Sequence, residues 1–212
     1  MRSMMWVLLV CVFALVSASA ATISVLGSLD GHCDYGCPGN TTPGDYAQYA
    51  AAVYSFTLNS QTTAYAITFS YGGGVNGSGT LIANGGFEPY LSLFDSGGNF
   101  LASTYFGTTC PPGANSVGGN CFDVSLDGGT LLPGVYQIAL TAWENFSLAE
   151  NYGSGHLSDG FTGLGNLGAN ENLNYAFDII LPANTPEPAS LGLAAIGCGL
   201  LLVRKRILRR SA

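Results

Sequence analysis

Hydrophobic and polar residues alternate through much of the chain after residue 47, with the period of two that is typical of β-strands. The clearest example is the segment 52–58, in which Tyr54, Phe56 and Leu58 share one face and the residues between them share the other. On the same ground we expect further strands at 64–71, 80–83, 90–94, 100–104, 122–126, 135–143 and 175–181.

The strand expected at 64–71 repeats this alternation and places Tyr65, Ile67 and Phe69 on one face. The Asn-Ser-Gln segment at residues 59–61 is expected to form the turn that precedes it.

Segments rich in glycine, aspartate and asparagine separate the expected strands. The segments 90–94 and 100–104 flank Asp-Ser-Gly-Gly-Asn, which predicts a β-hairpin because glycine tolerates a positive φ. Residues 132–134 predict a turn, 72–79 a flexible loop, and the polar stretch 144–172 an excursion over the surface. About eight short strands without a convincing amphipathic helix indicate an all-β fold. The favoured architecture is an antiparallel β-sandwich with jelly-roll topology.

A continuous apolar run near the start of the chain differs from these alternating segments. This run, residues 4–16, follows Arg2 and precedes the small residues of 18–20. These features predict a secretory signal peptide over residues 1–20, so the mature chain would begin at Ala21.

A second apolar run, residues 189–203, is expected to form a transmembrane helix, although about 15 residues are few where roughly 20 are usual. A Pro-Glu-Pro motif precedes the run and a basic stop-transfer cluster follows it: Pro186, Glu187 and Pro188, then Arg204, Lys205 and Arg206. The basic residues place the end of the chain in the cytoplasm. The expected order is signal peptide, β-sandwich cargo domain, linker, helix and cytoplasmic tail: 1–20, 21–182, 183–188, 189–203 and 204–212.

Basic residues are confined to the two ends of the chain. No Lys or Arg lies between residues 3 and 203, whereas all 13 acidic residues lie between Asp30 and Glu187. The exported part therefore carries 13 carboxylates and no Lys or Arg, which argues strongly against nucleic-acid binding because no cation neutralises the phosphates. Attraction to an anionic polysaccharide or lipid would need a bridging divalent cation.

Export changes how the cysteines are interpreted. Cys11 and Cys198 lie in the apolar end segments, which leaves Cys33, Cys37, Cys110 and Cys121. Four cysteines in an oxidising compartment predict two disulfides, with three pairings open. Pairing of sequence neighbours is favoured, Cys33 with Cys37 and Cys110 with Cys121. A zinc site that includes His32 is the alternative, but Cys110 and Cys121 lack the paired spacing of zinc ligands.

Two groups of residues are candidate ligand-binding sites. Asp95, Asn99 and Asp123 lie beside turns, where their oxygens could coordinate Ca²⁺; alternatively, Asp and Asn there only form the turns. Trp143 and Tyr136, with Tyr105 and Tyr152 as further candidates, could form an aromatic platform for a sugar; alternatively, aromatic residues in an alternating strand belong to the core.

The exported part contains none of the common catalytic motifs. Glycoside hydrolysis needs only two suitably spaced carboxylates, and Glu88, Glu144, Glu150 and Asp159 could supply them. Nothing in their spacing selects a pair. A protein without catalytic residues and without a cofactor is therefore favoured, with calcium as the one ion left open.

The C-terminal segments resemble the PEP-CTERM sorting signal of Gram-negative bacteria, in the order of its three parts: 186–188, 189–203 and 204–206. This resemblance covers about 27 residues and implies recognition and cleavage by an exosortase, a membrane-embedded cysteine protease. It also implies an association with exopolysaccharide and biofilm. The segments 54–58, 89–99 and 132–143 are similar to secreted β-proteins that carry this tail and to the bacterial pre-peptidase C-terminal sandwich, which implies architecture only.

The favoured hypothesis is an exported, non-enzymatic protein of the cell envelope or extracellular matrix. Its expected partners are the secretion translocon, signal peptidase, an exosortase and, less directly, extracellular polysaccharide. The precursor would be anchored in the inner membrane before it reaches the cell surface or matrix. The alternative is a carbohydrate-binding module of the matrix, assisted by calcium, and the second alternative is a glycoside hydrolase.

Overall fold

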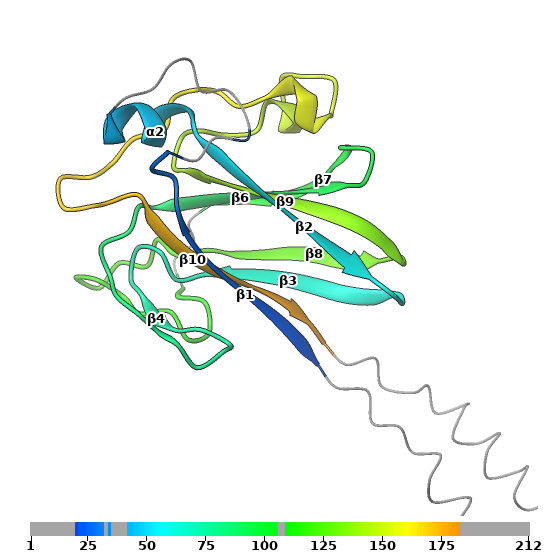
Figure 1. The fold of residues 1–212 in the computed structure, drawn as a ribbon, viewed down its shortest axis with the longest axis horizontal. Coiled ribbons are helices and arrows are strands. Elements are labelled where there is room, and N and C mark those ends of the chain that lie inside the picture. Colours follow the sequence, from blue (N-terminus) through cyan, green and yellow to red (C-terminus); the bar gives the residue numbers. More distant parts are fainter. Residues whose placement is uncertain (1–19, 32–33, 35–41, 106–108, 183–212) are drawn as a thin grey trace, which may run out of the picture. The chain divides into compact units, whose positions relative to one another are not determined.

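The computed structural model describes residues 20–31, 34, 42–105 and 109–182. Within these residues, Ala21–Pro182 forms one compact unit (Figure 1). The apolar part of the expected signal peptide, the sorting motif, the expected transmembrane helix and the basic tail lie outside the described residues. Among the residues that are described, no helix has the length and apolar character needed to cross a membrane.

Eight of the strands form two four-stranded sheets in which all neighbouring strands run antiparallel. The first sheet has the order β1-β10-β3-β8, with the bounds Ala21–Ser28, Asn174–Leu181, Thr62–Thr68 and Ser125–Leu131. The second sheet has the order β2-β9-β6-β7, with the bounds Ala51–Leu58, Gly134–Ala142, Pro89–Asp95 and Phe100–Thr104. The predicted all-β, antiparallel class is confirmed.

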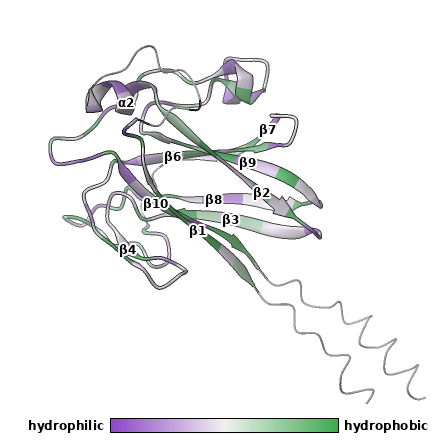
Figure 2. Cartoon of the chain, in the orientation of Figure 1, coloured by the Kyte–Doolittle hydropathy of each residue, from purple (hydrophilic) through white to green (hydrophobic). Residues whose placement is uncertain are grey.

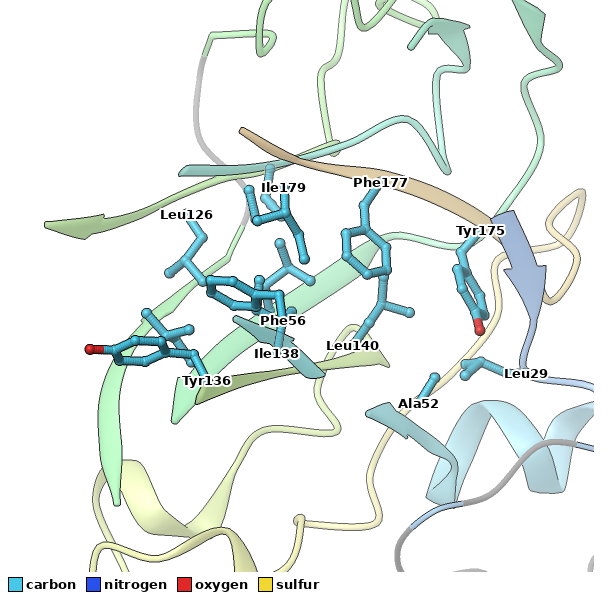
Figure 3. Close-up of a cluster of buried hydrophobic side chains, with 14 of the residues drawn as sticks. Leu29, Ala52, Phe56, Leu126, Tyr136, Ile138, Leu140, Tyr175, Phe177 and Ile179 are labelled. Carbon is cyan, nitrogen blue, oxygen red and sulfur yellow. The ribbon is translucent and has the colours of Figure 1, made fainter. Parts of the chain in front are cut away.

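The main hydrophobic core contains side chains from both sheets (Figure 3). Phe56, Ile138 and Leu140 of the second sheet point toward Phe177 and Ile179 of the first, and none of the five is more than 5% exposed. Burial of one side chain of this size contributes about 1.5–3 kcal/mol. Contacts between the two sheets are therefore a main source of the domain's stability. Figure 2 shows hydrophobic residues along β2 and β9 and a largely hydrophilic loop before β10.

The alternation predicted for β2 is confirmed. Tyr54, Phe56 and Leu58 all belong to or pack against the main core. Ser55 and Thr57, which lie between them, are exposed. A strand with one buried face needs this period because successive side chains point to opposite sides of the sheet.

Strand β3 faces the core with its small residues rather than its large ones. Ala64 and Ala66 belong to the main core. Ile67 and Phe69 belong instead to a separate cluster with Ala176, on the other side of the first sheet. Hydrophobic residues from the segments between β3 and β6 and between β7 and β8 pack against this cluster, so the outer face of the sheet is buried where the cluster lies.

The hairpin predicted from the Asp-Ser-Gly-Gly-Asn segment is confirmed, because β6 and β7 pair antiparallel on either side of it. The strands predicted at 135–143 and 175–181 match β9 and β10 to within one residue at each end. The strand predicted at 122–126 is displaced, since β8 starts only at Ser125. The reason is that Asp123, just before β8, directs its carboxylate at the backbone that follows β3.

The elements that were not predicted include the edge strand β1 and the short helix α2, Pro43–Tyr49. The helix begins with a capping box, in which Asp45 N donates to Thr42 Oγ1 at 3.3 Å and Thr42 N donates to Asp45 Oδ2 at 3.0 Å. The remaining short elements are β4, β5, η1 and η2, at Gly74–Val75, Leu81–Ile82, Leu148–Glu150 and Leu157–Asp159. Of these, β5 matches the short strand expected at 80–83.

The two ends of the sandwich can be told apart by the pairing of β1 with β10. Ala21 pairs with Leu181 at one end of this ladder, and Ser28 pairs with Asn174 at the other. We call the end that carries Ala21 and Leu181 the proximal end, and the opposite end the distal end.

Candidate functional site

Asp95 and Asn99, two of the expected calcium ligands, form the turn between β6 and β7 at the proximal end. Asp95 Oδ1 accepts hydrogen bonds from Gly97 N at 2.8 Å and Asn99 N at 2.9 Å, and Oδ2 accepts from Asn99 Nδ2 at 2.7 Å. Hydrogen bonds from the Asn99 side chain and backbone hold the pKa of Asp95 below its ordinary value. In this arrangement both residues stabilise the turn.

Asp123, the third expected ligand, is only 1% exposed. Its Oδ1 accepts from Thr68 Oγ1 at 2.9 Å and from Ser70 N at 2.6 Å, and its Oδ2 accepts from Gly72 N at 2.7 Å. Burial raises the pKa of Asp123, while these hydrogen bonds oppose the rise. The carboxylate thus fixes the chain segment that follows β3.

The structure does not bring the three expected calcium ligands together. Asp95 pairs with Tyr136 where β9 begins, at the proximal end, whereas Asp123 contacts Thr68 where β3 ends, at the distal end. Within the described part of the chain, no three or more His, Cys, Asp and Glu side chains form a group that could hold a metal ion.

Trp143 and Tyr136, the expected sugar platform, lie at opposite ends of β9. Tyr136 is 8% exposed, its ring centroid lies 5.7 Å from that of Phe56, and its hydroxyl donates to Leu132 O at 2.8 Å. These contacts place it in the core. Trp143 is half-buried, and its ring centroid lies 5.8 Å from that of Tyr105, which is 57% exposed. Tyr105, rather than Tyr136, is therefore the aromatic neighbour that could share a ligand with Trp143.

Three of the four acids considered for hydrolysis accept a hydrogen bond from a nearby side chain. The donors are Asn166 Nδ2, Tyr90 Oη and Ser154 Oγ, which bind Glu144, Glu150 and Asp159 at 3.0, 2.8 and 2.7 Å. Each carboxylate thus helps to fix the long loop between β9 and β10, in agreement with its place in the sequence.

Glu88, the fourth acid, has different surroundings at the distal end. It is half-buried, and burial raises the pKa of its carboxyl group, with a further rise from the negative charge of Glu171. The same two carboxylates also raise the pKa of Tyr71, after the larger effect of burial. Glu88 O accepts from Trp143 N at 2.8 Å. Glu88 thus contacts Trp143 through its backbone carbonyl and interacts electrostatically with Tyr71 and Glu171 through its side chain.

A disulfide joins Cys110 and Cys121, whose Cα atoms are 5.1 Å apart. This is the local pairing that the sequence favoured, and it closes the loop just before Asp123. Cys33 and Cys37, together with His32 of the zinc alternative, lie outside the described residues.

The distal end also carries a groove that sequence reasoning missed. Two depressions of about 310 and 340 Å³ have the lining residue Asn84 in common, and together we call them the Asn84 groove. Its polar lining includes Asn84, Asn170, Asn172, Asn174, Tyr71 and Glu171. The available signal was the recurrence of asparagine in two glycine-containing segments, 84–86 and 168–174, which sequence reasoning did not assign to a site.

A comparison of the chain with protein-family models finds no match, and a comparison with curated protein sequences also finds none. The assignment of a function therefore depends on the residues and the geometry described above.

Proposed function

We propose that this chain is an exported, non-enzymatic protein of the cell envelope or extracellular matrix, sorted by an exosortase through its PEP-CTERM-like tail and associated with exopolysaccharide. The precursor would pass through the secretion translocon and lose residues 1–20 to signal peptidase. The apolar run 189–203 would then hold it in the inner membrane until the exosortase removes the tail.

The observation that supports this proposal is the position of the first and last residues of the folded unit. Ala21–Pro182 is compact, begins at the residue where the signal peptide is expected to be cut, and ends four residues before Pro186. Ala21 and Leu181 pair in one ladder, so the first and last strands of the unit are neighbours in the first sheet. Cleavage at both expected points would leave every strand of the domain intact.

The strand orders support classification as a jelly roll. Successive strands alternate between the sheets at both ends of the domain: β1, β2 and β3 do so, and so do β8, β9 and β10. Eight strands in two such sheets are typical of jelly rolls. Because this architecture hosts many functions, it assigns no activity by itself. We propose a non-catalytic role because Glu144, Glu150 and Asp159 each accept a hydrogen bond from a neighbouring side chain.

A carbohydrate-binding module of the matrix is the second candidate function, favoured by the contact of half-buried Trp143 with exposed Tyr105. Aromatic rings offer a rigid, amphipathic surface of the kind on which sugars pack. Glycan-array binding, measured with and without a chelator, tests this candidate and its dependence on calcium. If the chain binds no glycan on the array, the carbohydrate-binding candidate is excluded and only the first candidate function remains.

Intact-mass spectrometry of the protein exported by an exosortase-containing host tests the first candidate. We expect a chain that begins at Ala21 and lacks the residues beyond about Glu187, whereas a host without the exosortase should retain the tail. Glu187→Ala should block tail removal, and Glu171→Ala, a matched change within the folded unit, should not. An exported form that still contains Arg209 and Arg210 would contradict the proposal.

A further inference from the structure

The Asn84 groove lies at the distal end of the sandwich, and its two depressions border different segments. The first depression borders Gly27 and Asn174, where β1 ends and β10 begins. The second borders Tyr71 and Glu171. Each depression is within the usual range for small-ligand sites, about 300–1,000 Å³. Since Asn84 lines both, an extended ligand could occupy the two depressions and contact Asn84 at its middle.

Backbone hydrogen bonds join the segments that line the groove. Gly85 N donates to Tyr71 O at 3.0 Å, and Asn172 N donates to Gly85 O at 2.9 Å. Next to these hydrogen bonds the two segments pack so closely that a Cβ atom at Gly86 would lie 2.4 Å from Asn174 O. Three segments distant in the sequence are thus held in place before a ligand arrives, which lowers the entropy cost of binding.

The side chains along the groove suit a neutral ligand that is rich in hydroxyl groups. Asn84 and Asn170 are exposed, and no described residue forms a hydrogen bond with either side chain. Each amide offers two donors and one acceptor, so it can bind adjacent sugar hydroxyls. Tyr71 adds an aromatic ring, held by an edge contact with Phe122 at a centroid distance of 4.9 Å. Such a ring can pack against the apolar face of a sugar.

The charge of the domain disfavours anionic polymers at this surface. Of the 13 acidic residues of the chain, only Glu187 lies beyond Pro182, so residues 21–182 carry 12 carboxylates and no Lys or Arg. Glu171 lines the groove itself, and Glu88 lies close enough to interact with it. An anionic polysaccharide would be repelled from this end of the domain, whereas an uncharged one would not.

We propose that the Asn84 groove binds a segment of an uncharged polysaccharide. The amides of Asn84 and Asn170 hydrogen-bond to its hydroxyls, and the ring of Tyr71 packs against a sugar face. This inference rests on the proposed function, which places the domain among matrix polysaccharides, and it adds both the site and the ligand class.

Isothermal titration calorimetry of the full-length chain in detergent tests the inference. The probes are uncharged hexasaccharides of β-1,4-glucan, α-1,4-glucan, β-1,4-mannan and β-1,4-N-acetylglucosamine, with hexagalacturonate as the charged comparator. We expect at least one uncharged probe to bind with a Kd on the order of 10⁻⁴ M. Asn84→Ala and Asn170→Ala should each weaken binding about tenfold, the effect of one lost hydrogen bond. The matched control is Asn59→Ala, an exposed asparagine beyond β2 at the proximal end, which should leave binding unchanged.

Three outcomes would overturn the inference: no binding by any uncharged probe, binding of hexagalacturonate alone, or binding that neither Asn84→Ala nor Asn170→Ala weakens. Loss of binding only in Trp143→Ala would place the sugar on the Trp143–Tyr105 pair and would overturn it as well. Unchanged melting temperatures verify that the variants fold, as expected for exposed residues. Tail removal is measured separately by mass spectrometry, so a failure of the groove is distinguishable from a failure of the sorting proposal.

Discussion

Replacement of Asp123 by asparagine is expected to destabilise the domain although the two side chains have nearly the same shape. The Asp123 carboxylate is 1% exposed and accepts four hydrogen bonds. Oδ1 binds Thr68 Oγ1, Ser70 N and Tyr71 N at 2.9, 2.6 and 3.2 Å. Oδ2 binds Gly72 N at 2.7 Å. All four partners are donors, and asparagine has only one oxygen to accept from them.

The expected loss in the free energy of unfolding follows from the number of hydrogen-bond donors that the substitution leaves without an acceptor. If the asparagine oxygen takes the place of Oδ1, its amide group faces Gly72 N, and one buried donor costs about 1–3 kcal/mol. Removal of a buried charge offsets part of this cost, because burial raises the pKa of Asp123. We therefore expect the free energy of unfolding to fall by about 1–2 kcal/mol for Asp123→Asn. Asp123→Ala loses all four hydrogen bonds and should cost about 4 kcal/mol, a large part of the ~5–15 kcal/mol of a typical domain.

Urea unfolding of the full-length chain at neutral pH, followed by intrinsic fluorescence, measures these differences. The matched control is Asp127→Asn, because Asp127 is exposed and accepts a surface hydrogen bond from Gly129 N at 2.8 Å. That variant should lose no more than about 0.5 kcal/mol. Equal m-values would show that the transitions can be compared. If Asp123→Asn and Asp127→Asn unfold at the same urea concentration, the buried carboxylate does not hold the segment after β3.

Two further predictions concern pH and the disulfide. Because burial and Glu171 raise the pKa of Glu88, the folded chain binds this proton more tightly than the unfolded chain, so stability falls as pH rises through the raised pKa. The melting temperature of Glu88→Gln minus that of the parent should therefore increase from about pH 4 to about pH 7. A difference that stays constant over this range would contradict the raised pKa of Glu88. Replacing both Cys110 and Cys121 by serine opens a loop with a sequence separation of 11 and should lower the free energy of unfolding by about 3 kcal/mol without reductant. An unchanged urea midpoint would show that this loop is held by other contacts.

Hydrophobic alternation identified the strands in which one face carries large side chains, such as β2 and β9. It did not identify β1, an edge strand whose Ile23 and Leu26 are 40% and 58% exposed. Alternation also shows which side chains share a face but not which face meets the main core. Ile67 on β3 and Phe69 just after it lie outside the main core, in a cluster that segments distant in the sequence cover.

Among the candidate sites, those formed by contacts local in the sequence could be predicted, and those formed by distant contacts could not. Asp95 binds residues two and four positions along the chain, so its place in a turn could be predicted from the sequence. Asp123 binds donors 51 to 55 positions away, and its burial depends on the path of the whole first sheet. The Asn84 groove also combines segments that only the fold brings together, which explains why loop composition alone did not reveal it.

The pairing of β1 with β10 relates the groove to the expected route of export. Leu181 ends the ladder beside Ala21 at the proximal end, so the chain enters and leaves the domain at the same end. Asn174, which borders the groove, begins β10 seven residues earlier. At about 3.3 Å per residue, these two positions are about 23 Å apart along the strand. The Asn84 groove therefore lies at the end of the sandwich opposite the end at which Leu181 completes the first sheet.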